Sequence, residues 1–229
     1  MLRVSTVLLS LSVLAAALPV GAKAQQAQDS NGLSGFYTEL RGGVNFLDNA
    51  RNSGNANPIF PTGTAKTDFG TGFTLGAAIG YKFSDRDRWG SGFWNGVRTE
   101  LEVGYGQDDI NVPMEQFENS QQPDIDGWRF MANTYYDIDT GTRFTPYVGA
   151  GLGFTSLDLN NAGLSDKSDT TFTYQFRGGV DYALTKQFSV NVGYRYLDTD
   201  NPKFTNNDGS LFQTEYNSHA IELGLRYSF

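Results

Sequence analysis

Charged residues stand at alternating positions in several segments of this chain, a spacing that suits ion pairing. Glu39 and Arg41 are two residues apart, as are Glu100 and Glu102. Side chains two residues apart in a strand lie on the same face, so these segments bring carboxylates and guanidinium groups together. The residues that share this pattern are Glu39, Arg41, Lys82, Arg98, Glu100, Glu102, Arg129, Asp137, Arg177, Asp181, Arg195, Glu222 and Arg226.

The sequence lacks the set of residues that hydrolytic catalysis usually requires. A nucleophile or an activated water usually works beside a histidine that a carboxylate orients. The only histidine is His219, and the segment Asn217-Ser218-His219 has no fixed third member nearby. His219 shares its alternation with Ile221 and Leu223, so we expect it to face lipid headgroups and not the charged set. An outer-membrane lipid-modifying enzyme is therefore a weaker alternative to a non-enzymatic protein.

Cofactor and nucleic-acid binding are also disfavoured by composition and motifs. The glycines of Gly149-x-Gly151-x-Gly153 follow the period of a strand and precede no helix, unlike a phosphate-binding loop. The chain has no cysteine, which excludes disulfides and cysteine-ligated zinc. Its net charge of -8 opposes a nucleic-acid partner, whose phosphates require a basic surface. We predict no cofactor, no metal centre and no nucleic-acid partner.

Eight segments alternate apolar and polar residues with the period of a β-strand. Strands of about 10 to 12 residues can cross a bilayer when tilted. The connections 47–70, 107–126, 156–170 and 198–216 are long and polar, and the intervening ones are shorter. Short periplasmic turns opposite long extracellular loops are typical of outer-membrane barrels. The pattern predicts an all-β, eight-stranded, antiparallel up-and-down transmembrane β-barrel, with strands near 36–46, 73–83, 97–105, 128–138, 148–154, 172–182, 188–196 and 221–229.

A secreted soluble barrel of the lipocalin type is the alternative for the same periodicity, because its apolar faces point inward. Glycines distinguish the two. Many occupy the polar faces, including Gly76, Gly104 and Gly193. On an exposed surface they would weaken the strands, whereas in a narrow lumen they make room for arginines that cross it. The glycine pattern therefore favours polar faces that point inward.

Residues 1–24 have the order of a secretory signal peptide. Arg3 precedes an apolar run at 7–20, and Ala22-Lys23-Ala24 supplies a cleavage signal. The apolar run is too short to span a bilayer as an anchor. We therefore predict an exported protein with a short periplasmic segment at 25–34 and a barrel domain at 35–229.

Three segments resemble the small OmpA-like and opacity-protein-like surface barrels. PYVGAGLGF (146–154) is similar to the fifth-strand signature of that superfamily, and VGYRYLD (192–198) to the seventh-strand signature. The ending LGLRYSF (223–229) resembles the Phe-terminated last strand that the barrel assembly machinery reads, which would make Tyr227 and Phe229 an assembly signal. The resemblance covers 35–229 and implies residence in a Gram-negative outer membrane, surface antigenicity, and in some members adhesion or weak porin activity.

The charged set determines whether such a barrel conducts. Its seven bases and six acids nearly cancel. An eight-stranded barrel is only wide enough for its side chains to fill it, and unpaired charges inside are costly. We predict a lumen closed by ion pairs, with a narrow porin-like channel as the alternative. We also hypothesise that Arg41, Arg195 and Glu222 share contacts, because the first, seventh and eighth strands are neighbours.

The predicted external loops carry fifteen acids against four bases. Asp108-Asp109 and Asp198-Thr199-Asp200 are the best local candidates for binding divalent cations that bridge to lipopolysaccharide. No twelve-residue calcium loop appears, which favours a solvated surface open to host or surface ligands. Outer-membrane lipid and lipopolysaccharide are the other expected partners. The fifteen acids are Asp48, Asp68, Asp108, Asp109, Glu115, Glu118, Asp124, Asp126, Asp158, Asp166, Asp169, Asp198, Asp200, Asp208 and Glu215.

Overall fold

A computed structural model describes most of the region predicted to form the barrel. The described residues are 33–47, 50–54, 66–69, 71–83, 94, 96–111, 124–160, 164–166, 168–200, 203–206, 211–214 and 216–229. The predicted signal peptide and residues 25–32 of the predicted periplasmic segment lie outside them, so both remain predictions. Within these ranges the chain forms no helix that is long and apolar enough to cross a membrane.

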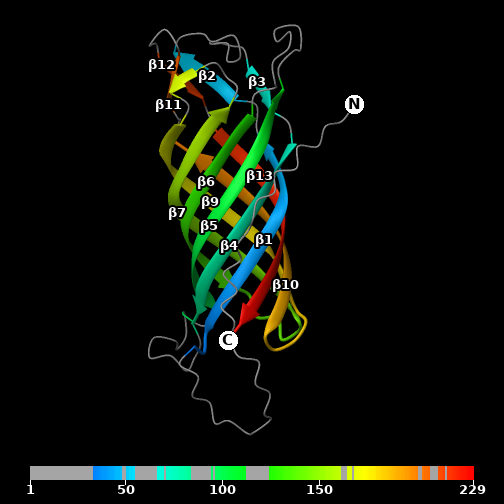
Figure 1. Ribbon diagram of the computed structural model, residues 1–229. Helices are drawn as coiled ribbons and strands as arrows, with labels where there is room; N and C mark the ends of the chain where they lie inside the picture. Colours follow the sequence, from blue (N-terminus) through cyan, green and yellow to red (C-terminus); the bar gives the residue numbers. More distant parts are fainter. Residues whose placement is uncertain are drawn as a thin grey trace, which may run out of the picture. The chain divides into compact units, whose positions relative to one another are not determined.

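Eight strands close into a barrel in which all neighbours run antiparallel (Figure 1). The first and last of them close the wall, in a register that runs from Tyr37 opposite Ser228 to Leu47 opposite Ser218. The predicted eight-stranded up-and-down barrel is confirmed. Its strands are β1 (Phe36–Leu47), β4 (Thr71–Lys82), β5 (Val97–Asn111), β6 (Asp124–Asp137), β7 (Phe144–Asn160), β9 (Ser168–Ala183), β10 (Phe188–Thr199) and β13 (Tyr216–Ser228).

The long connections contain more strand than the sequence indicated. β5, β6, β7 and β9 continue several residues into the predicted loops, and five short strands pair beyond them in the order β3, β2, β12, β11 and β8, with β3 joined to β5. The predicted long connections are present, but the sequence did not indicate the strands within them, because these polar segments lack the alternation that marks a strand. The short strands are β2 (Ala50–Gly54), β3 (Lys66–Phe69), β8 (Leu164–Asp166), β11 (Lys203–Asn206) and β12 (Leu211–Thr214).

Two connections at the opposite end are short, as predicted. Between β9 and β10, the hydroxyl of Thr185 accepts hydrogen bonds from the backbone N–H groups of Gln187 at 3.1 Å and Phe188 at 2.9 Å. Between β6 and β7, the carboxylate of Asp139 accepts one from the N–H of Gly141 at 2.8 Å. These side chains take the place of ladder partners and tighten the turns.

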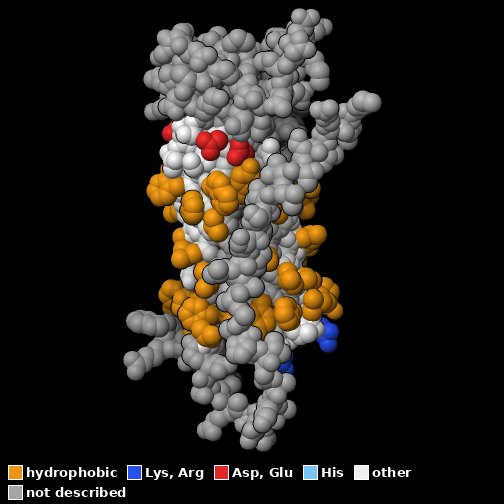
Figure 2. Space-filling view, in the orientation of Figure 1, with side chains coloured by type: hydrophobic (Ala, Val, Ile, Leu, Met, Phe, Trp, Pro, Cys, Tyr) orange, Lys and Arg blue, Asp and Glu red, His pale blue; other side chains and the backbone are white. Residues whose placement is uncertain are grey.

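The outer face of the barrel wall is apolar and its inner face is polar. Leu101 and Leu223, which point outward, are 65% and 68% exposed, whereas Arg98 and Glu222 are 1% and 4% exposed. Figure 2 shows the outward hydrophobic side chains as a belt, with acidic side chains beyond one edge and basic ones beyond the other. A soluble barrel would have the reverse arrangement, because exposed apolar surface is unfavourable in water. The apolar face is suited to hydrocarbon.

Candidate functional site in the barrel lumen

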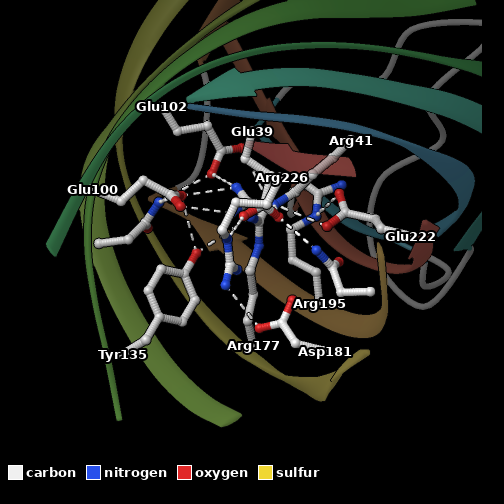
Figure 3. A network of polar contacts seen from close by, with 12 residues as sticks. Glu39, Arg41, Glu100, Glu102, Tyr135, Arg177, Asp181, Arg195, Glu222 and Arg226 are labelled. Carbon is white, nitrogen blue, oxygen red and sulfur yellow. Dashed lines mark hydrogen bonds and ion pairs between the residues drawn. The ribbon is translucent and has the colours of Figure 1, made fainter. Parts of the chain in front are cut away.

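The predicted charged set lies inside the barrel, with one partial exception. Twelve of its thirteen members are buried. The exception is Lys82, whose side chain is 48% exposed at the end of β4. Each of the eight barrel strands contributes inward side chains at every second residue, so the lumen is filled from all sides. Figure 3 shows how ten of the lumen residues converge.

The inner end, where β1 begins and β13 ends, holds a first group of ion pairs around Asp137. This carboxylate accepts hydrogen bonds from Arg98 Nε at 2.8 Å and from Lys82 Nζ at 2.7 Å. The guanidinium carbon of Arg98 lies 4.0 Å from the ring centroid of Tyr135 and 4.9 Å from that of Tyr147. Two aromatic faces and a carboxylate therefore fix the Arg98 side chain in place.

A second group surrounds Glu39 on β1. Its carboxylate oxygens accept hydrogen bonds from Arg226 Nε and from Arg41 Nε, each at 2.7 Å. Arg226 also donates from Nη1 to Asp181 Oδ2 at 2.9 Å. The Asn191 amide donates to Glu39 Oε1 at 2.9 Å. These contacts tie β1, β9, β10 and β13 together across the lumen.

The middle of the lumen is organised by Glu100 and Glu102 on β5. Arg41 donates to both oxygens of Glu100, from Nη1 at 2.8 Å and from Nη2 at 2.7 Å. Glu102 Oε1 lies 3.0 Å from Arg177 Nη2 and 3.4 Å from Arg129 Nε. Charge-assisted bonds of this kind are about twice as strong as neutral ones, and the two parallel bonds of Arg41 add geometric specificity.

Glu222 on β13 forms a further group with three arginines, one part of which corrects the sequence hypothesis. Its oxygens lie 3.3 Å from Arg195 Nε and 3.3 Å from Arg177 Nη2. The hypothesised contact between Arg195 and Glu222 is present. Within the described residues, however, Arg41 makes no ion pair with Glu222. Its side chain instead extends past β4 to Glu100 and Glu102 on β5, two strands along the wall.

Above these charges, the outer end of the lumen is closed by apolar side chains. Ile125, Leu157 and Leu197 point inward and are 1% to 2% exposed, and Tyr216 lies beside them at 7%. A cavity of only about 10 Å³ remains here, and Leu157, Leu197 and Tyr216 line it together with Arg129 and Arg195. The four side chains Ile125, Leu157, Leu197 and Tyr216 are called the outer apolar layer below. The sequence analysis missed it, although the alternation that places Arg195 inward also extends to Leu197.

Asp108 belongs to this outer region and not to an exposed loop. It is 1% exposed. Its Oδ2 accepts hydrogen bonds from Asn45 Nδ2 at 2.8 Å and from the Tyr216 hydroxyl at 3.2 Å. The placement of Asp108 in an external, solvated loop, where it was a candidate cation ligand, is wrong, because β5 continues to Asn111 and carries this residue inside. The side chain of Asp109 lies outside the described residues.

In the second candidate cation-binding segment, Asp198-Thr199-Asp200, the Asp198 carboxylate already accepts hydrogen bonds from other side chains. Asp198 accepts hydrogen bonds from the hydroxyls of Tyr174 and Tyr196. The intervening Thr199 points inward and donates to the backbone oxygen of Tyr216 at 3.3 Å. Across the described ranges, no group of three or more His, Cys, Asp or Glu side chains could hold a metal ion. His219 lies on the outer face, as its alternation predicted, where its ring contacts Tyr194 and Tyr196.

Two close approaches explain why glycine is frequent on the inner face. A Cβ atom at Gly104 would lie 2.6 Å from the guanidinium carbon of Arg129. At Gly80 it would collide with the ring of Tyr37. The first contact is of the kind that the glycine pattern predicted, and the second involves a residue absent from the predicted set. Tyr37, Tyr135 and Tyr147 all fill the inner end, and only their alternation with the charged residues could have indicated this.

Comparison with known proteins agrees with this architecture. A family model described as the outer membrane protein β-barrel domain matches residues 10–229. The chain belongs to this family. It is 28% identical over 189 residues to a 22 kDa outer membrane protein of Rhizobium leguminosarum bv. viciae, covering 75% of this chain and 82% of that protein. It is 26% identical over 180 residues to the outer membrane protein PagN of Salmonella typhimurium, covering 69% and 73%.

A solved structure has the same fold. The crystal structure of Neisserial surface protein A covers 87% of this chain and 100% of its own chain, with a TM-score of 0.56 and 22% sequence identity. The predicted outer-membrane location is confirmed by the family and by the named relatives. In an outer-membrane barrel, short turns face the periplasm and longer connections face the exterior. The inner end of the lumen therefore faces the periplasm, and the outer apolar layer faces the exterior.

The predicted assembly signal lies at the periplasmic end of the outer-membrane barrel. The Tyr227 ring centroid is 5.1 Å from that of Phe229 and 5.0 Å from that of Phe188. The N–H of Phe229 donates to the backbone oxygen of Phe36 at 3.0 Å. Tyr227 and Phe229 thus lie at the seam between the first and last strands. Their recognition by the assembly machinery remains a prediction.

Proposed function

We propose that this outer-membrane barrel is a non-enzymatic surface protein with a structural, antigenic or adhesive role, and that its lumen does not conduct. The observation that carries the proposal is the filling of the lumen above its periplasmic mouth. Ion pairs of Glu39, Glu102 and Glu222 occupy the middle, and the outer apolar layer covers them. A hydrophobic constriction opposes ion passage by excluding water.

The extended strands support a role at the cell surface. β5 and β7 contain 15 and 17 residues, more than the roughly 9 to 11 that a tilted strand needs to cross the bilayer. The five short strands add to this wall beyond the membrane. External segments held by strand pairing form a firm platform for host or surface ligands. The acidic composition of these segments and contact with outer-membrane lipid and lipopolysaccharide fit the same proposal.

A narrow porin-like channel is the second candidate, and one observation favours it. A cavity of about 440 Å³ opens at the periplasmic mouth and extends to Tyr37, Arg98 and Arg226. Solutes could enter the lumen there. Passage would still require displacement of the charged groups and of the outer apolar layer, so the closed barrel is the better supported function.

Enzymatic activity has weaker support still. His219, the one histidine of the chain, lies on the outer face and contacts Tyr194 through a hydrogen bond to Nδ1. The buried carboxylates of the lumen are engaged by arginines, which suits ion pairing better than proton transfer at a reacting group. We infer a binding or structural role.

Conductance across planar bilayers tests whether the lumen is closed. The purified, refolded protein should insert without discrete current steps. A variant with Leu157→Ser and Leu197→Ser opens the outer apolar layer to water and should raise the frequency of current steps. Stable discrete channels in the unmodified protein would contradict the proposal and establish the porin alternative.

Antibody binding to intact cells tests surface display. Antibodies raised against a peptide of residues 107–126 should bind cells without permeabilisation. Antibodies against a peptide of residues 183–189 should bind only after the outer membrane is permeabilised, and they serve as the matched control. The reverse result would contradict the orientation on which the surface role rests.

A further inference from the structure

A connected group of polar and aromatic side chains lies on the outer face of β9, β10 and β13, toward the extracellular end. The Tyr194 hydroxyl contacts His219 Nδ1, and the ring centroids of Tyr194 and Tyr196 lie 5.8 Å and 5.2 Å from that of His219. The hydroxyls of Tyr174 and Tyr196 both donate to Asp198 Oδ2. These five residues are called the β10 cluster below. Their mutual contacts order the rings and the carboxylate on the surface that faces the membrane.

The β10 cluster lies at the depth where hydrocarbon gives way to lipid headgroups. Tyr196 and Asp198 are eight and ten residues along β10 from Phe188, which contacts Tyr227 at the periplasmic end. At about 3.4 Å per residue and a tilt of about 40°, these separations are roughly 20 Å and 26 Å across the membrane. The apolar band of an outer-membrane barrel is about 25 Å tall. Asp198 therefore reaches the headgroups of the outer leaflet.

The same arrangement recurs on β5 and β6. Trp128 and Asp126 are eight and ten residues along β6 from Tyr136 at its periplasmic end. The Tyr105 ring centroid lies 5.2 Å from that of Trp128, and the Tyr105 hydroxyl donates to Asp126 Oδ2 at 3.2 Å. Tyr105, Asp126 and Trp128 are called the β6 cluster below. On the strands between the two clusters, β7, β1 and β4, the last outward aromatic residues are Phe154, Phe46 and Phe73.

Neither cluster contains a lysine or an arginine. Of these side chains, those that the structure describes are six arginines buried in the lumen and Lys82, Arg143 and Lys186 at the periplasmic end. Arginine and lysine are the usual partners of phosphate, which a carboxylate repels. A carboxylate instead accepts hydrogen bonds from neutral hydroxyls, and an aromatic face attracts the partially positive C–H groups of a sugar ring. The chemistry of both clusters favours the sugar part of a headgroup over its phosphates.

We propose that the β10 and β6 clusters bind sugar rings of lipopolysaccharide in the outer leaflet. Asp198 and Asp126 accept hydrogen bonds from sugar hydroxyls. The rings of Tyr194 and Trp128, which are 49% and 48% exposed, pack against sugar faces. A carboxylate offers about four acceptor sites, and the two tyrosine hydroxyls use two of those at Asp198. The inference rests on the surface role proposed above and assigns residues to its lipid contact.

Amide NMR spectra of the refolded barrel in phosphatidylcholine bicelles test where the contact lies. Added lipopolysaccharide should give saturable shifts at residues 194–198, 217–219 and 126–128, and smaller shifts at 44–46 and 152–154. Phosphatidic acid, which carries a phosphate without a sugar, should give no saturable shift at either cluster. Equal shifts around the whole wall, no shifts, or the same response to phosphatidic acid would overturn the proposal. Conductance and surface display do not enter this measurement, so its failure would leave the closed lumen and the surface role to their own tests.

Asp198→Asn separates recognition of hydroxyls from recognition of charge. The variant exchanges charge-assisted hydrogen bonds for neutral ones, so the affinity for lipopolysaccharide at the β10 cluster should fall about three- to tenfold. The shifts at 126–128 report the β6 cluster and should keep their midpoint. If phosphate were the bound group, removal of the negative charge would tighten binding, and such a rise would overturn the proposal. A saturable shift with phosphatidylethanolamine that Asp198→Asn abolishes would assign the site to an ammonium group and would overturn it equally.

Tyr194→Leu and Tyr182→Leu form a matched pair at the two ends of the wall. Tyr194 belongs to the β10 cluster, whereas Tyr182 lies opposite Phe144 at the periplasmic end of β9. Loss of the Tyr194 ring should weaken lipopolysaccharide binding at the β10 cluster about two- to tenfold, because a sugar face loses its aromatic partner. Tyr182→Leu should leave that affinity unchanged. Equal weakening by the two variants would show a general effect of outward rings on the barrel in lipid and would overturn the site.

Discussion

At the periplasmic end of the lumen, charged side chains surround a cavity of about 440 Å³, whereas at the extracellular end leucines adjoin a cavity of about 10 Å³. The same barrel wall therefore encloses a polar mouth and an apolar closure. Water can satisfy unpaired donors in a polar cavity of sufficient size. It has few partners among Leu157, Leu197 and Ile125. This difference supports the proposal that the barrel does not conduct, although its lumen holds many charges.

The largest effect should come from the charges beneath the closure. Glu102→Gln removes the charge that Arg177 and Arg129 face at 3.0 Å and 3.4 Å. Because the arginines stay buried, we expect a loss of about 3–5 kcal/mol in the free energy of unfolding. Urea unfolding in lipid vesicles measures it. Lys186→Gln, at an exposed turn, is the control and should change stability by no more than about 0.5 kcal/mol. Equal effects would mean that Glu102 is not a buried partner.

The outer apolar layer should respond through packing and not through charge. Leu197→Ala leaves a cavity beside a side chain that is now 2% exposed, and should cost about 2–5 kcal/mol in the free energy of unfolding. Leu184→Ala, at a turn residue that is 48% exposed, is the matched control and should cost less than about 1 kcal/mol. A change at Leu197 no larger than the control would show that the layer is loosely packed.

The interaction energy between Arg195 and Glu222 tests whether the ion pairs of the lumen contribute to stability through direct contact. The two atoms Arg195 Nε and Glu222 Oε1 lie 3.3 Å apart. Arg195→Met combined with Glu222→Gln should cost less than the sum of the single changes, by about 0.5–3 kcal/mol. The double-mutant cycle is measured by urea unfolding in vesicles. Strict additivity would contradict the contact.

The smallest effect is expected at the periplasmic rim. Lys82 pairs with Asp137 at 2.7 Å, but its side chain is 48% exposed. Water screens such a pair, and Arg98 still binds Asp137 after the change. Lys82→Gln should therefore cost less than about 1 kcal/mol on urea unfolding. A cost near that of Glu102→Gln would contradict the distinction between the wet mouth and the dry interior.

The amino-acid sequence by itself determined the barrel strands and the faces that their side chains occupy. The period of two is a local property of an extended chain, so it could be read from single segments such as 97–105 and 221–229. The alternation places Arg195 and Glu222 on one shared face, because an antiparallel register keeps neighbouring polar faces on the same side. The glycines of that face then predicted that it points inward.

Tertiary structure alone decided the partners across the lumen and the length of the wall outside the membrane. Arg41 binds Glu100, 59 residues away, because β4 pairs with both β1 and β5 and the curved wall brings their inward side chains together. No local pattern encodes that distance. Asp108 became a buried lumen residue, and the short strands β2, β3, β8, β11 and β12 formed, because backbone groups of polar segments paired beyond the belt. Strand pairing satisfies backbone hydrogen bonds whatever the side chains are, so the sequence pattern did not reveal it.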